Sequence, residues 1–210
     1  MPTIPADMIL AFDTSTAACT AALFDGSGEC VAKADERIGR GHAERLVPML
    51  DEMLGGRRAD RIIVGVGPGS FTGIRVGLAA AHGLAIGWDA ELAGMSSLAL
   101  LAASANAEAQ VAAAMAGGHG ELFVQQFDGQ TLAPLSELQN LPPDEAARAT
   151  DAELAVGSGA GQLVEARGWG EARDAFPSAA DALRLPEALR SLPAKPVYAR
   201  APDARALEPA

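Results

Sequence analysis

The 210-residue sequence predicts an α/β protein that is organised as two lobes. Short apolar runs typical of strands alternate with longer runs typical of helices. One such series closes near residue 105, and a second begins with a glycine-rich hairpin at residues 110–129. We therefore expect an N-terminal lobe over residues 7–105 and a smaller C-terminal lobe over residues 106–210.

The first lobe is predicted to open with three antiparallel strands and a helix. The runs "MILAFDT" (8–14), "AACTAALF" (17–24) and "ECVAKA" (29–34) have strand length and are separated by polar turns. In the following "GHAERLVPMLDEMLGG" (41–56), the apolar positions cover an arc of roughly 160° at 100° per residue. This helix has more apolar surface than one core contact requires.

The most unusual stretch is "VGVGPGSFTGIRVGLAAAHG", residues 64–83, which joins a buried strand to a helix. It lacks the Lys-Ser or Lys-Thr of a P-loop, the spacing of a dinucleotide fingerprint and the G-x-S-x-G of a hydrolase. Ser70 is predicted to cap the helix. Small residues recur every four positions from Gly69 to Ala85. Such a row lets a second backbone approach closely, either inside the fold or from a partner.

The rest of the chain alternates in the same way. "AELAG" (90–94) predicts a strand, and "SSLALLAASANA" a helix capped by Ser96 or Ser97. In the second lobe, "PPDEAARA" predicts a helix and "ELAVGSGAG" (153–161) a strand that enters a glycine turn. The proline-rich tail predicts only short helical pieces.

Charge and composition narrow the function classes. A net charge of −11 and a pI near 4.6 disfavour binding to nucleic acid or an anionic membrane without a basic partner. No Lys or Arg precedes Lys33, so no secretory signal is expected, and the predicted location is cytoplasmic. Cys19 and Cys30 are expected to be packed, unreactive thiols. His42, His82 and His119 lack metal-ligand spacing.

A family resemblance covers nearly the whole chain. The segments "ILAFDTSTAACTAALF", "GHAERLVPML", "GVGPGSFTGIRVGLAAAHGLA", "GMSSL" and "PVYAR" resemble, in order and spacing, those of the bacterial TsaB (YeaZ) family. The resemblance implies the two-lobed fold of actin, Hsp70 and sugar kinases (the ASKHA fold) with a reduced second lobe. It also implies a non-catalytic scaffold or activating subunit for TsaD, which transfers threonylcarbamoyl to the adenosine next to the anticodon in tRNAs reading codons that begin with A.

The superfamily's nucleotide positions are altered in this chain. Asp13 is followed by Thr14 and Ser15, where nucleotide-binding members carry D-x-G-[TS]. Residues 116–118 are Ala-Gly-Gly, where the family often has Asp-Ala-Arg. Asp13, Gly157 and Gly159 are therefore only weak candidates for cofactor binding, and no catalytic or metal-binding residue is assigned. ATP and magnesium are expected on the partner subunits. The alternative is an ATP-dependent phosphotransferase or ATPase in which Asp13 positions magnesium.

The resemblance also predicts the assembly. The expected partners are a TsaD homologue, a TsaE-type ATPase through the complex and tRNA only through the complex, with no membrane. A homodimer is expected in isolation. The predicted partner interface consists of His42, Leu46, Met49, Leu50, Met53, Gly69, Phe71, Gly73, Ile74, Gly77 and Ala81.

Overall fold

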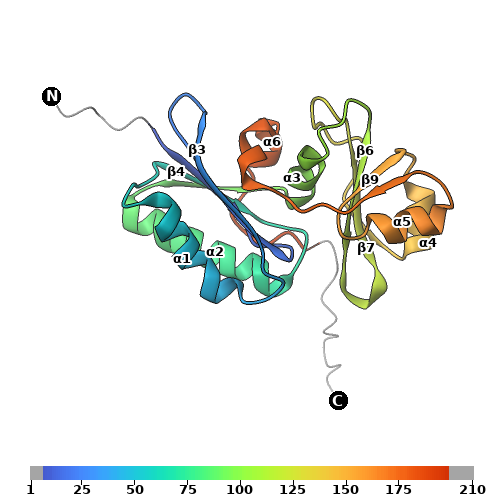
Figure 1. Cartoon of the computed structure of the whole chain (residues 1–210), viewed down its shortest axis with the longest axis horizontal. Coiled ribbons are helices and arrows are strands. Elements are labelled where there is room, and N and C mark those ends of the chain that lie inside the picture. Colours follow the sequence, from blue (N-terminus) through green and yellow to red (C-terminus); the bar gives the residue numbers. More distant parts are fainter. Residues whose placement is uncertain (1–6, 199–210) are drawn as a thin grey trace, which may run out of the picture.

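The computed structural model describes residues 7–198 and places them around two five-stranded sheets (Figure 1). In the first sheet, β1 pairs antiparallel with β2 and parallel with β4, while β3 and β5 form the edges. The predicted antiparallel meander is confirmed. The strands are β1 (Ile9–Asp13), β2 (Ala18–Phe24), β3 (Cys30–Arg37), β4 (Arg61–Gly65) and β5 (Glu91–Met95).

The second sheet has the order β10-β9-β6-β7-β8 and is built on the predicted hairpin of β6 and β7. A single 3-10 turn, Gly118–Gly120, lies at the tip of this hairpin. The predicted strand before the glycine turn and the predicted helix after the two prolines are both present. The strands are β6 (Val111–Ala116), β7 (Leu122–Phe127), β8 (Gln139–Leu141), β9 (Leu154–Val156) and β10 (Glu171–Arg173).

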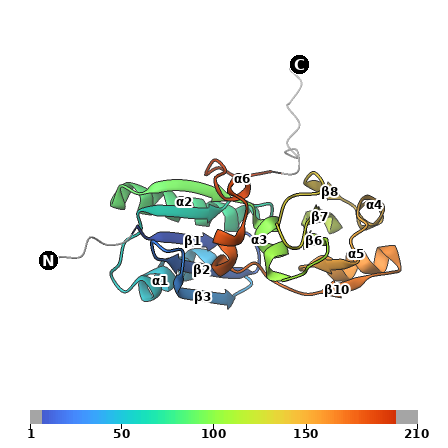
Figure 2. The ribbon, with the colours of Figure 1, turned by 90° about the horizontal axis from the view of Figure 1, so that it is seen from above.

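Helices cover both sheets and also separate them. Helices α1 (His42–Leu54) and α2 (Phe71–Trp88) pack on the outer face of the first sheet, and α4 (Pro143–Ala149) and α5 (Ala160–Arg167) on that of the second. Helix α3 (Ser97–Ser104) lies between the two sheets, as Figure 2 shows. Its residues 97–103 are all buried, and residues 98–103 join a core shared by both sheets. This shared core holds the two lobes together.

After β10 the chain returns to the first lobe through η2 (Ala179–Arg184) and α6 (Glu187–Arg190). The backbone N–H of Ala179 donates to Thr20 Oγ1 over 2.7 Å. Leu192 then pairs with Gly94 on the free edge of β5. An edge strand offers unpaired backbone groups, which this segment satisfies. Residues in the range 178–198 therefore pack with the first lobe, and the division at residues 105 and 106 stays a prediction.

The row of small residues in α2 faces the interior of the lobe. A Cβ atom on Gly73 would lie 1.9 Å from the carbonyl oxygen of Thr14, and one on Gly77 would lie 2.6 Å from Thr14 Oγ1. Thr14 Oγ1 also donates to the carbonyl oxygen of Gly73 over 2.7 Å. The glycines thus let α2 pack directly against the turn between β1 and β2. Of the two interpretations of the row, packing inside the fold is the one that the structure supports.

Two glycine-to-alanine changes in the same helix should have opposite effects on stability. Gly73→Ala should lower the free energy of unfolding by about 1–3 kcal/mol, because the new methyl group meets backbone that cannot move aside. Gly83 is exposed, and no atom outside its own helix turn lies within 4 Å of its Cβ position. Gly83→Ala should therefore raise that free energy by roughly 0.5–1 kcal/mol. Urea denaturation followed by circular dichroism measures both, and equal stability of the two variants would contradict the inward packing.

Candidate functional site

Asp13, at the end of β1, is completely buried and fully hydrogen-bonded. Its Oδ1 accepts from the backbone N–H of Ser15 over 2.7 Å and from Ser15 Oγ over 2.6 Å. Its Oδ2 accepts from Ser97 Oγ, at the start of α3, and Ser97 Oγ in turn accepts from the N–H of Gly67 over 3.2 Å. The carboxylate lies against Gly65 in β4, where a Cβ would be 1.8 Å from Oδ2. Asp13 therefore joins three loops of the first lobe.

These contacts do not fit the alternative role of Asp13 as a magnesium ligand. A magnesium site needs carboxylate oxygens that face an open, hydrated space. Both oxygens of Asp13 accept hydrogen bonds from the protein, and the side chain has no exposed surface. Within residues 7–198, no group of three or more His, Cys, Asp or Glu side chains is arranged to hold a metal ion.

The glycines of the second-lobe turn have a packing role. Gly157 follows β9 with φ of +119°, and a Cβ there would lie 2.4 Å from the carbonyl oxygen of Ala114 in β6. The N–H of Gly159 donates to the same oxygen over 3.0 Å. Both residues therefore allow the turn between β9 and α5 to pack against β6. This is the strand-to-helix turn that the sequence predicts.

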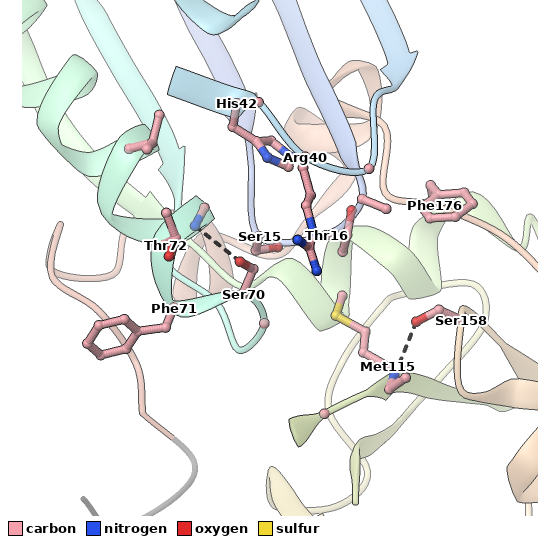
Figure 3. Close-up of a pocket in the computed structure, with 18 of the residues that line it drawn as sticks. Ser15, Thr16, Arg40, His42, Ser70, Phe71, Thr72, Met115, Ser158 and Phe176 are labelled. Atoms are coloured by element: carbon pink, nitrogen blue, oxygen red, sulfur yellow. Dashed lines mark hydrogen bonds between the residues drawn. The ribbon is translucent and has the colours of Figure 1, made fainter. Parts of the chain in front are cut away.

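A cavity of about 910 Å³ lies between the lobes. The first lobe contributes the turn at Ser15 and Thr16, the loop at Arg40 and the start of α2, while the second contributes residues 115–118 and Ser158. Figure 3 shows the Arg40 side chain extending into this space. The sequence pattern did not identify Arg40 or Thr16 as lining residues, because the cavity forms only where distant loops meet.

Two side chains that line the cavity, Ser70 and His42, have contacts within the protein. Ser70 Oγ accepts from the N–H of Gly73 over 3.2 Å, which confirms that Ser70 caps α2. His42 is buried, and its Nε2 lies 3.2 Å from the carbonyl oxygen of Ala18. Both side chains therefore make a structural contact within the first lobe.

Most of the predicted interface residues are buried in the first lobe's own core. Helices α1 and α2 use their apolar faces to cover the first sheet, and burial of these side chains in the free chain does not favour a contact with a partner. Their assignment to the interface stays a prediction. Met53 and Gly69 are half-buried, whereas Phe71 is 54% exposed. The buried residues are His42, Leu46, Met49, Leu50, Gly73, Ile74, Gly77 and Ala81.

A different set of residues on the same two helices faces outward. Ile86 is 84% exposed and Val47 is 61% exposed, although both are large apolar side chains. From residue 71 to 88, the only Asp, Glu, Lys or Arg is Arg75. A helix that is apolar on nearly all sides is normally covered on all sides. We define the outer helical surface as the exposed residues Ala43, Val47 and Pro48 of α1 with Thr72, Ala79, Gly83 and Ile86 of α2.

The remaining candidate groups lie on different elements: Cys19 in β2, Cys30 in β3, His82 in α2 and His119 in the turn Gly118–Gly120. Cys19 is buried, and desolvation raises the pKa of its thiol to about 11. Cys30 is exposed at the edge of the first sheet, so the expectation that both thiols are packed was wrong for Cys30. His82 and His119 are exposed. In the part of the chain from 7 to 198, no helix has the length and apolar character needed to cross a membrane.

The sequence is similar to that of proteins of tRNA threonylcarbamoyladenosine biosynthesis. A family model described as TsaD, tRNA N6-adenosine threonylcarbamoyltransferase, matches residues 35–158, more than half of the chain. The tRNA threonylcarbamoyladenosine biosynthesis protein TsaB of Escherichia coli is 38% identical over 128 residues, which are 57% of this chain and 54% of that protein. TsaB of Haemophilus influenzae is 42% identical over 103 residues, which are 46% of this chain and 42% of that protein. The matches thus span about half the length of these curated relatives.

A solved structure matches over nearly the full length. The structure of YeaZ from Pseudomonas aeruginosa superposes with a TM-score of 0.78 at 32% identity, covering 91% of this chain and 99% of that one. The match and the two mixed sheets confirm the predicted two-lobed ASKHA fold. The chain therefore belongs to the TsaB (YeaZ) family of tRNA threonylcarbamoyladenosine biosynthesis proteins.

Proposed function

We propose that this chain is a non-catalytic subunit that binds a TsaD-type partner and supports threonylcarbamoyl transfer to the adenosine next to the anticodon, in tRNAs reading codons that begin with A. Family membership supports a role in this pathway. The match to a TsaD family model also supports a shared fold between the two subunits. Related lobes can pair through equivalent faces around an approximate two-fold axis.

The observation that carries the proposal is the outer helical surface. This surface carries the exposed apolar side chains of Ile86 and Val47 and the small residues Ala79 and Gly83, which would let a partner helix approach closely. Transferring an 84%-exposed Ile86 from water to an interface is favourable by roughly 1.5–3 kcal/mol. A second copy of the chain can use the same surface when no partner is present.

We assign the catalytic chemistry to the partner because the polar side chains of this chain that could take part in it are hydrogen-bonded within its own fold. Asp13 is hydrogen-bonded and buried, and Ser70 caps a helix. The net charge of −11 also opposes the tRNA backbone, so the complex must supply its basic surface elsewhere. We place the TsaE-type ATPase and the tRNA in contact with the complex rather than with this chain alone.

A charge placed in the outer helical surface should prevent partner binding without unfolding the chain. Ile86→Asp should weaken binding to the TsaD-type protein of the same organism by about 30-fold or more, the loss typical of a central interface residue. Its melting temperature should stay close to that of the original chain, because Ile86 packs against little else. Isothermal titration calorimetry measures the affinity.

The matched control is Leu135→Asp, which places the same charge on an exposed apolar residue, 52% accessible, in the second lobe. This variant should bind the partner as well as the original chain does. Unchanged affinity of Ile86→Asp, or an equal loss in both variants, would rule out the proposed surface.

Threonylcarbamoyl transfer should require the partner. The chain alone should give no modified tRNA by mass spectrometry of nucleosides, and product should appear when the TsaD-type protein and the other pathway proteins are added. Calorimetry with ATP and magnesium should show no binding that depends on Asp13, because its carboxylate is buried. Turnover by the isolated chain that Asp13→Ala abolishes would favour the phosphotransferase alternative instead.

A further inference from the structure

We propose that the turn between β1 and β2 is a positioning device for α2, and that Thr14 is the residue through which it acts. The family resemblance places this turn at a phosphate site in nucleotide-binding members. In this chain its groups point to the protein's own helices instead. The part of the inference that concerns partner affinity rests on the proposed function, whereas the part that concerns α2 does not.

The first step is the way in which the turn itself is fixed. Asp13 accepts two hydrogen bonds from Ser15, which sets the conformation of the turn. It also accepts from Ser97, which ties the turn to the start of α3. Because a buried carboxylate is costly without donors, these bonds restrain the turn to one arrangement.

The second step is the contact from the turn to α2. The carbonyl oxygen of Ser15 accepts from the N–H of Ser70 over 2.6 Å, and Thr14 Oγ1 donates to the carbonyl oxygen of Gly73 over 2.7 Å. The glycines at 73 and 77 leave no space between the helix and Thr14. The first two turns of α2 are therefore held by Thr14 and Ser15, both of which are buried.

The third step links this contact to the exposed face of the helix. Thr72 belongs to the outer helical surface and lies next to Gly73 in the sequence, so both residues move together when the first turn of α2 moves. Ser15 also lines the interlobe cavity, together with residues 70–73 at the start of α2. The turn and the start of α2 thus meet at the cavity, and the contacts from Thr14 and Ser15 set the position of the helix that carries the outer helical surface.

The test is a set of three variants with two readouts. Thr14→Val keeps the shape of the side chain and removes the hydroxyl group, and Thr14→Ser retains the hydroxyl group. The control is Thr150→Val in the second lobe, where the buried hydroxyl group likewise donates to a main-chain oxygen, that of Ala146, over 2.7 Å. The readouts are amide hydrogen exchange over residues 70–77 in the full chain and calorimetric affinity for the TsaD-type protein.

Thr14→Val should speed exchange at residues 70–77 by about tenfold, because losing the hydrogen bond leaves the Gly73 carbonyl group without this donor. The same variant should also bind the partner less tightly. Thr14→Ser, which keeps the hydroxyl group, should have the exchange rate and the partner affinity of the original chain. Thr150→Val should change neither the exchange at residues 70–77 nor the partner affinity, even if it lowers the melting temperature as much as Thr14→Val does. This control therefore distinguishes a general loss of stability from a loss of helix positioning.

The outcomes separate this inference from the proposed function. Unchanged exchange at residues 70–77 in Thr14→Val, or an equal increase in Thr150→Val, would overturn the positioning role of Thr14 while leaving the proposed function intact. Faster exchange with unchanged partner affinity would overturn the link to the outer surface. If the original chain does not bind a TsaD-type protein, the proposed function fails, and faster exchange in Thr14→Val would still support the role of the turn in holding α2.

Discussion

The buried carboxylate of Asp13 is the interaction on which the first lobe depends. Its two oxygens accept from Ser15 and Ser97, and through Ser97 it also restrains the N–H of Gly67. The turn after β1, the loop after β4 and the start of α3 are thereby held at one point. A carboxylate in this position could serve a metal in a hydrated cleft, but here protein donors surround it completely. In the hydrogen bonds seen here, the carboxylate of Asp13 thus serves to hold these segments of the first lobe together.

The helices between the sheets and those outside them differ in how much apolar surface they expose. Helix α3 is buried between the sheets and joins the lobes through one shared core. Helices α1 and α2 bury one face against the first sheet and leave Val47 and Ile86 exposed on the other. An exposed apolar face on a firmly positioned helix is suited to partner binding. The interlobe cavity, by contrast, is lined by groups that mostly serve the protein itself.

Local patterns predicted the elements well, because strand and helix periodicity, glycine turns and serine caps depend on neighbouring residues. The meander, the hairpin and the cap at Ser70 were predicted correctly, and of the two candidates for the cap of α3, Ser96 and Ser97, it is Ser96 that caps the helix. The direction of the glycine row could not be predicted in this way, because Gly73 contacts Thr14, 59 positions earlier in the chain. The bond from Ser97 to Asp13 spans 84 positions. The candidate site consists of such long-range contacts, so the sequence alone could not show that most of the predicted interface residues are buried in the first lobe.

The structure of this chain in complex with a TsaD-type protein would test the account most directly. The account predicts that the partner's helices cover the outer faces of α1 and α2, with Ala79, Gly83 and Ile86 in the interface and the turn at Thr14 unchanged. An interface built on the second sheet or on α4 and α5 would contradict it, as would a partner side chain or nucleotide phosphate bound directly to Asp13.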